Sequence, residues 1–172
     1  MARFPDHLLP HCEVIKEQLR RLFRSWEDDL AVQWQSHNGH LSIRVPSPLA
    51  QSEGDLELAF HTQEVDVFFQ HWHSHLPLDA TADCFAADLA ELCRLVDGIL
   101  ADRLVVMHRY SGSDRVSSSL VSISPTTPPG TNMLTVGYPP GTVQVITRTE
   151  TRSWSGAADQ DHEHSRSERS SA

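Results

Sequence analysis

Apolar residues recur at steps of three and four positions in two stretches of the chain, which is the spacing of one face of a helix. The first stretch, with Val14, Leu19 and Trp26 among its apolar positions, predicts an amphipathic helix over residues 10–26. The second predicts a helix over residues 85–100. Charged residues occupy the intervening positions in both, so each helix should present one face to a core.

Elsewhere apolar residues alternate with polar ones, as they do in strands with one buried face. Two alternating runs flank Asn38-Gly39, a dipeptide typical of tight β-hairpins, and predict a hairpin there. Further strands are predicted at residues 56–60, 103–110, 119–124 and 142–152. A turn is predicted at residues 111–114, and Pro- and Gly-rich loops at 125–130 and 139–141.

Residues 64–75 also alternate, and they predict one continuous strand. Because successive side chains of a strand point to opposite faces, the two sets of positions should lie on opposite sides of the sheet. One face would carry the aliphatic residues and the histidines, namely Val65, Val67, Phe69, His71, His73 and His75. The other face would carry Glu64, Asp66, Phe68, Gln70, Trp72 and Ser74.

The order of these elements, a helix, several strands, a second helix and more strands, predicts an α+β fold. We expect a single, mostly antiparallel sheet with both helices packed on one face. Residues 1–156 should form one domain, because the apolar periodicity stops after Trp154. Residues 157–172 are small, polar and charged, so they are expected to form a disordered acidic and polar tail.

His71, His73 and His75 are the chain's most unusual feature and suggest a metal site. Neutral imidazole is a common metal ligand, and zinc accepts nitrogen ligands at about 2.0–2.1 Å. Alternate strand positions lie about 6–7 Å apart, so a bound ion would need a further ligand from a neighbouring strand. The nearest candidates for that ligand in the sequence are His61, Asp66 and His108.

The alternative is that these imidazoles are structural, half-buried at the edge of the core and hydrogen-bonded to carbonyls and acidic groups. Arg109-Tyr110 and Asp114-Arg115 are candidates for the rim of a pocket beside them. No G-x-S-x-G elbow accompanies the serine run at residues 117–119, so the sequence assigns no catalytic residue.

A docking surface is the competing interpretation, and it rests on the aromatic residues of the same predicted strand. Phe68 and Trp72 should share the face opposite the histidines with Glu64 and Asp66, and Trp154 lies beside a later strand. Aromatic residues are enriched at the cores of protein interfaces, so these residues are a candidate partner-binding site. The alternative is that the N-terminal hairpin covers them as a second layer.

The charge of the chain narrows the class of partner. It has 23 acidic and 14 basic residues and a formal charge of −9 at pH 7. Nucleic-acid binding relies on clustered Lys and Arg, so this balance disfavours nucleic acid and favours a basic protein partner. No stretch reaches the ~20 apolar residues of a membrane span. The three cysteines are scattered along the chain, which is typical of reduced thiols and not of a disulfide framework. We therefore expect a cytoplasmic protein with no membrane partner.

Two segments also resemble a family. Residues 65–76 are similar to a strand of the form V-x-V-x-F-D-x-(Y/W)-H-(T/S)-H-F in a group of small, mostly uncharacterised bacterial proteins. Residues 152–156 resemble the closing strand of that group. Gln70 stands where the pattern has an acid, and Leu76 where it has Phe. Some members look like immunity proteins encoded beside polymorphic secreted toxins.

The resemblance implies an immunity-type binding protein, without a cofactor, that sequesters a cognate and basic protein toxin. The competing class is a small metal-binding protein or metal-dependent enzyme that uses His71, His73 and His75 with a divalent ion such as zinc. Gln70 disfavours this second class, if the acid that it replaces served a metal or catalytic site. A scaffold or regulatory domain without chemistry is a third possibility.

Overall fold

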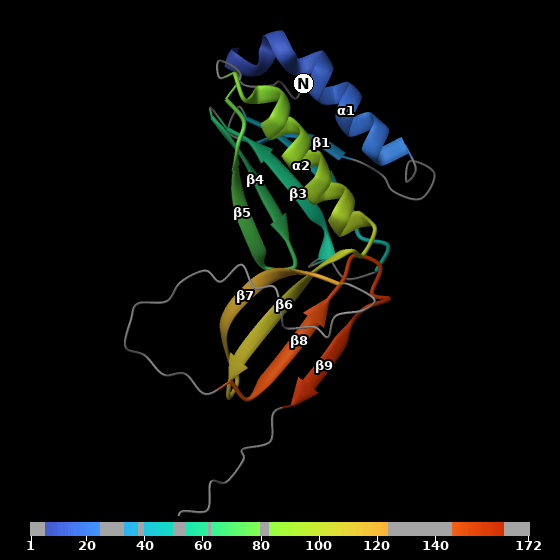
Figure 1. The fold of residues 1–172 in the computed structure, drawn as a ribbon, viewed down its shortest axis with the longest axis vertical. Coiled ribbons are helices and arrows are strands. Elements are labelled where there is room, and N and C mark those ends of the chain that lie inside the picture. The colour runs from blue at the N-terminus through green and yellow to red at the C-terminus, as the bar shows by residue number, and fades with distance from the viewer. Residues whose placement is uncertain are drawn as a thin grey trace, which may run out of the picture.

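The computed structural model describes residues 6–24, 33–37, 40–49, 54–61, 63–79, 83–123 and 146–163. Within these residues the fold is α+β, with two α-helices and two antiparallel sheets (Figure 1). The predicted α+β class is confirmed, whereas the prediction of a single sheet is wrong. The helical elements are a 3₁₀ helix η1 (Asp6–His11), α1 (Cys12–Arg24) and α2 (Phe85–Leu100).

The first sheet is a meander in which each strand pairs with the next, in the order β1-β2-β3-β4-β5. The predicted hairpin is confirmed by the pairing of His37 with His40, while Asn38 and Gly39 themselves lie outside the described residues. The predicted strand over residues 56–60 is also confirmed. The strands are β1 (Gln33–His37), β2 (His40–Val45), β3 (Leu56–Phe60), β4 (Glu64–Phe69) and β5 (Trp72–Pro77).

Alternation along these strands gives the first sheet one apolar face. Leu58 and Val67 are directly opposite each other and completely buried. They belong to one core cluster with Ile15 and Leu19 of α1 and with the buried side chains of α2. In Figure 1, α2 crosses in front of this sheet. Burial of each large aliphatic side chain contributes roughly 1.5–3 kcal/mol, so this layer accounts for much of the stability of the first sheet.

The predicted continuous strand over residues 64–75 is wrong, because the chain reverses at Gln70-His71. Both residues have positive φ, 50° and 62°, as the two central residues of a type I′ turn do. β4 and β5 therefore form a hairpin in which Phe69 pairs with Trp72. Residues that pair across strands share a face, so the turn exchanges the two faces for every residue after it.

The second sheet contains the remaining strands in the order β7-β6-β8-β9. The turn predicted near residues 111–114 is confirmed: Ser111 pairs with Asp114, and Gly112 has a φ of 63°. Of the strand predicted over residues 142–152, residues 142–145 lie outside the described residues, as do the predicted loops at 125–130 and 139–141. The strands are β6 (Leu104–Ser111), β7 (Asp114–Ser122), β8 (Arg148–Arg152) and β9 (Gln160–Glu163).

β9 corrects the prediction that the disordered tail begins at residue 157. Its residues pair with β8 from Thr151–Gln160 to Arg148–Glu163, although all four side chains are exposed. A strand at a sheet edge can be held by backbone hydrogen bonds and charge pairs, so it needs no apolar periodicity. Residues 164–172 lie outside the described residues, and their predicted disorder stays a prediction.

The two sheets meet at Trp154, which follows β8. Its side chain is 1% exposed and lies 6.0 Å from Phe69, centroid to centroid. Val106 of β6 and Leu120 of β7 belong to the same core cluster as the first sheet. The core therefore continues from one sheet to the other beneath the β4–β5 turn. Within the described residues, no helix combines the length and the apolar character that crossing a membrane requires.

Candidate functional site

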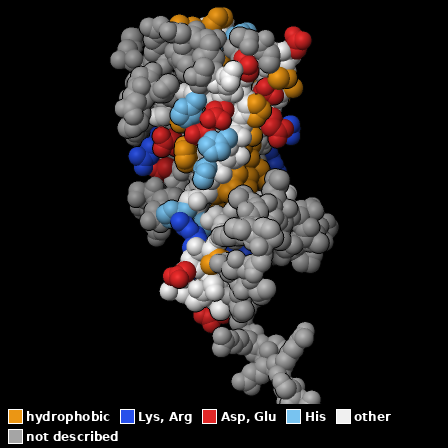
Figure 2. Space-filling model, turned by 90° about the vertical axis from the view of Figure 1, so that its left-hand side faces the viewer, with side chains coloured by type: hydrophobic (Ala, Val, Ile, Leu, Met, Phe, Trp, Pro, Cys, Tyr) orange, Lys and Arg blue, Asp and Glu red, His pale blue; other side chains and the backbone are white. Residues whose placement is uncertain are grey.

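The face of the first sheet opposite the helices carries the polar positions of β3, β4 and β5. We call it the open face. Figure 2 shows histidine and acidic side chains gathered on the side of the molecule that β4 and β5 form. Phe68 is the exposed aromatic residue here, at 39% exposure, and it stacks against His73 with 6.0 Å between ring centroids. The open face comprises Glu57, His61, Glu64, Asp66, Phe68, His73 and His75.

Three of the five residues predicted to bind a partner lie together on the open face, namely Glu64, Asp66 and Phe68. The other two do not. Trp72 pairs with Phe69 and packs against the core, because the turn places it on the helix side. Trp154 is buried where the two sheets meet. The proposed patch therefore keeps its acidic residues and one aromatic side chain but loses both indoles.

The three histidines predicted to share one face are divided between two places. His73 and His75 are neighbours on the open face, with ring centroids 5.4 Å apart. His71 lies in the turn, and its ring is 6.1 Å from that of His108 in β6. This arrangement therefore does not bring His71, His73 and His75 together around a single ion.

Asp66 joins two other side chains of the open face. Its Oδ1 lies 2.6 Å from His75 Nδ1, and its Oδ2 lies 3.0 Å from His61 Nε2. Asp66 and His75 are cross-strand partners, so the hairpin register sets their contact. The carboxyl group is 13% exposed, whereas the His61 and His75 side chains are 38% and 55% exposed. Asp66 and His61 were named as possible metal ligands from the sequence, although Asp66 was expected on the face opposite His75.

A second site is concave, and we call it the cleft. It lies where the β4–β5 turn approaches one face of the second sheet, and its volume is about 470 Å³. Tyr110 and Arg115, predicted from the sequence to rim a pocket, do line it, together with His71. Arg109 and Asp114, also predicted for the rim, do not line it; the Arg109 guanidinium donates instead to Ser119 Oγ, 3.0 Å away. The lining residues are Leu49, Gly54, Gln70, His71, His108, Tyr110, Arg115, Glu150, Arg152, Asp159, Gln160 and Asp161.

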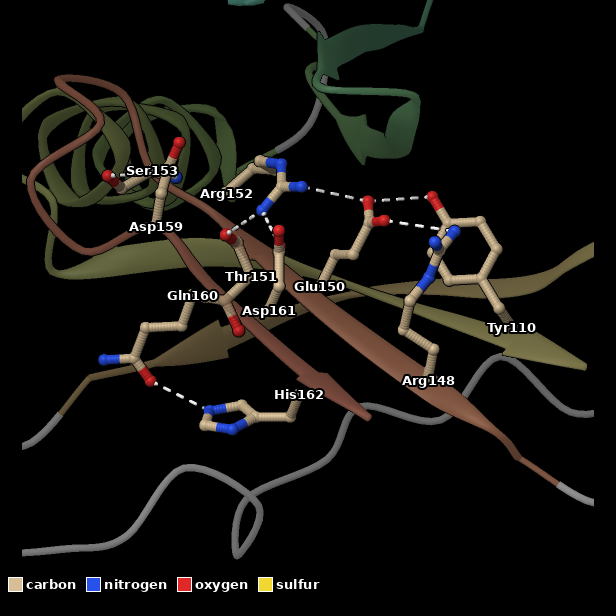
Figure 3. Close-up of polar contacts among 10 residues, drawn as sticks. All are labelled: Tyr110, Arg148, Glu150, Thr151, Arg152, Ser153, Asp159, Gln160, Asp161 and His162. Atoms are coloured by element: carbon tan, nitrogen blue, oxygen red, sulfur yellow. Dashed lines mark hydrogen bonds and ion pairs between the residues drawn. The ribbon is translucent and has the colours of Figure 1, made fainter. Parts of the chain in front are cut away.

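Glu150 is the centre of the cleft's polar network, shown in Figure 3. Its carboxylate accepts a hydrogen bond from Tyr110 Oη at 3.0 Å and lies 3.2 Å from Arg148 and 3.1 Å from Arg152. Burial, and then the bond to Glu150, raise the pKa of Tyr110. Arg152 also reaches Asp161 at 2.6 Å. Burial opposes the charge of Arg152, but Asp161 and Glu150 outweigh it and raise its pKa.

His108 forms an uncharged wall of the cleft. Its side chain is 3% exposed, and Nδ1 lies 2.8 Å from Ser118 Oγ. Burial, followed by the charges of Arg115 and His71, lowers its pKa to about 4, so the imidazole is neutral near pH 7. Ser118 is not among the residues that line the cleft. Its hydroxyl therefore orients the imidazole and does not present a nucleophile to the cleft.

The sequence alone did not indicate Glu150, Arg152 or Asp161 as site residues. They come together because β8 pairs both with β9, which follows it closely, and with β6, which is far from it in the chain. One pattern in the sequence could have indicated part of this site. Every second residue of β8 is charged, which places Arg148, Glu150 and Arg152 on one face of the strand. Comparison of the chain with protein families, with curated proteins and with solved structures finds no match. A functional proposal therefore rests on the open face and the cleft.

Proposed function

We propose that the protein is an immunity-type binding protein that sequesters a basic toxin by docking it on the open face. The observation that carries this proposal is Phe68, an exposed aromatic residue paired with Glu57 and flanked on its own strand by Asp66. An apolar ring at the centre of a patch with charged groups around it is a common arrangement at interface hot spots. The resemblance of residues 65–76 to strands of immunity-like proteins favours the same class of partner.

Charge supports a basic partner. The chain has a formal charge of −9, and Glu57, Glu64 and Asp66 place acidic groups on the open face itself. Arg44, the basic residue opposite Glu57, is already compensated by Asp55, whose Oδ2 lies 2.7 Å from Arg44 Nε. Complementary charge accelerates encounter and selects partners, which suits a protein that must capture a toxin quickly.

The cleft fits an enzyme less well. One of its two lining arginines, Arg152, is already compensated by Glu150 and Asp161. The hydroxyl beside its buried imidazole belongs to Ser118, which does not line the cleft. These features favour a structural role for the polar network over nucleophilic catalysis.

The proposal expects a neighbouring gene to encode the toxin domain, and the test is binding of that purified domain to this chain. Isothermal titration calorimetry measures the affinity, and stopped-flow fluorescence measures the association rate. Phe68→Ala should weaken binding at least tenfold, because truncation of a central aromatic hot spot typically costs more than about 1.4 kcal/mol. Glu57→Lys should mainly slow association and reduce its dependence on salt.

Val14→Ala is the matched control, because Val14 is an apolar side chain that is 50% exposed on α1, away from the open face. It should leave the affinity unchanged. Equal affinity of wild type and Phe68→Ala would contradict the proposal. So would a neighbouring gene without a toxin domain, or the absence of binding to that domain.

A further inference from the structure

The hairpin and the turn before it bring four metal-ligating side chains to one end of the open face. Asp66 of β4 is directly opposite His75 of β5. Glu64 lies two positions before Asp66 and so on the same face. His61 is held beside them because its backbone N–H donates to the carbonyl of Glu64 at 2.9 Å, which closes the turn between β3 and β4.

The donor atoms of three of these side chains converge, and His61 contacts the carboxylate of one of the three. Glu64, Asp66 and His75 each offer a ligand atom within 4.8 Å of the others. His75 Nδ1 and His61 Nε2 lie 2.6 Å and 3.0 Å from the two oxygens of Asp66. In a tetrahedral site with ligands at about 2.0–2.2 Å, neighbouring donor atoms are roughly 3.3–3.6 Å apart. An ion would replace the direct hydrogen bonds to Asp66, and the more exposed side chains of His61, Glu64 and His75 would move to make room for it.

We infer that His61, Glu64, Asp66 and His75 form a binding site for a divalent transition-metal ion of the zinc type. Two imidazole nitrogens with two carboxylates suit Zn²⁺, whereas Mg²⁺ and Ca²⁺ prefer sites made of oxygen ligands. The ligands come from a turn and from two paired strands, so most of the geometry exists before the ion binds. The inference does not depend on the docking of a toxin.

The site is distinct from the set His71, His73 and His75 that the sequence suggested. His75 belongs to both sets, but its partners here come from β4 and from the turn before it. His71 points to His108 at the cleft. His73 stacks on Phe68, on the side of the open face nearer the β4–β5 turn. Substitution of these two histidines therefore separates the two assignments.

Zinc binding is tested on the full chain, without an affinity tag and after treatment with a chelator, by calorimetry and by elemental analysis after dialysis. Wild type should bind one equivalent of Zn²⁺. Asp66→Asn and His75→Ala should each weaken binding at least tenfold, because each removes a charged or nitrogen ligand. Mg²⁺ at the same concentration should not compete.

His73→Ala and His71→Ala are the matched controls, and each should retain the bound equivalent. A His162→Ala, His164→Ala double variant should retain it too, which excludes a stray ion held by that part of the chain. The absorption spectrum of the Co²⁺-loaded wild type supplies a readout that needs no variant, because tetrahedral nitrogen and oxygen ligands give intense visible bands.

Absence of a stoichiometric ion in wild type, or its retention in both Asp66→Asn and His75→Ala, would overturn the inference. Loss of the ion in the His162, His164 double variant would overturn it as well. The toxin-binding experiment with Phe68→Ala is independent of these results, since Phe68 is not a ligand. Failure of one proposal can thus be distinguished from failure of the other.

Discussion

Phe69 and Trp72 face each other across the Gln70-His71 turn and lie on the same side of the first sheet. Their side chains pack against the core, together with Trp154 where the sheets meet. The pair fixes the register of the β4–β5 hairpin, and the register in turn places Asp66 opposite His75. The turn therefore determines both the open face and the approach of His71 to the cleft.

The turn should become more stable with residues that favour positive φ. His71 has a φ of 62°, a conformation that costs a non-glycine residue roughly 1–2 kcal/mol and glycine almost nothing. His71→Gly should raise the free energy of unfolding in urea by up to about 1 kcal/mol. His73→Gly, within β5, should lower it. A decrease with His71→Gly would show that the contact with His108 outweighs the backbone strain.

Trp154 and Phe68, two of the three aromatic residues that the sequence predicts for a docking patch, should behave very differently. Trp154→Ala removes a completely buried indole and should lower the free energy of unfolding by about 3–5 kcal/mol. Phe68→Ala removes an exposed ring and should change it by less than about 1 kcal/mol. Chemical denaturation followed by circular dichroism measures both. Comparable losses would contradict the assignment of Phe68 to the surface.

The buried imidazole of His108 should make the protein less stable in acid. Its pKa is about 4 in the folded chain, below the ordinary value of 6.5 expected on unfolding. The unfolded chain therefore binds more protons between these values, so the free energy of unfolding falls as pH decreases from about 6.5 toward 4. Above pH 6.5 this contribution is complete and constant.

The loss attributable to His108 should be about 1–3 kcal/mol near pH 4. It is measured as the difference in pH dependence between wild type and His108→Gln, by urea denaturation from pH 7 to pH 4.5. The variant should show a shallower decline, because glutamine does not titrate. Parallel curves would contradict the lowered pKa.

Glu150 should be important for the stability of the second sheet. Glu150→Gln leaves Arg148 and Arg152 without their shared carboxylate and should lower the free energy of unfolding by about 1–3 kcal/mol. Glu163→Gln is the control, because Glu163 is an exposed residue of β9. It should change stability by less than about 0.5 kcal/mol. Thermal denaturation of the two variants at low salt compares them.

Local periodicity was sufficient to predict both helices, the β1–β2 hairpin and the strands β3 and β6. It failed at Gln70-His71, because neither residue is a typical turn former and the histidines at 71, 73 and 75 continue the odd-numbered spacing of Val65, Val67 and Phe69. Before the turn, the predicted faces are correct, as with Phe68. After it they are reversed, as with Trp72 and His75.

The second sheet and the cleft could not be predicted for a different reason. β8 pairs with β6 although some 40 residues separate them in the chain, and no local pattern encodes that pairing. The same pairing brings Glu150 of β8 to Tyr110 of β6. The proximity of Asp66 to His61 could be predicted from the sequence, because both residues lie next to the turn between β3 and β4.

The polar strand β9 protects the edge of the second sheet against pairing with other molecules of this protein. β9 is the last strand in the order of the second sheet, and it shows Asp161, His162 and Glu163 to solvent. Charged residues on an outermost strand discourage strands of other molecules from adding to it. Without β9, the backbone N–H and C=O groups on that side of β8 would be unpaired. The second sheet could then aggregate by adding strands from other molecules.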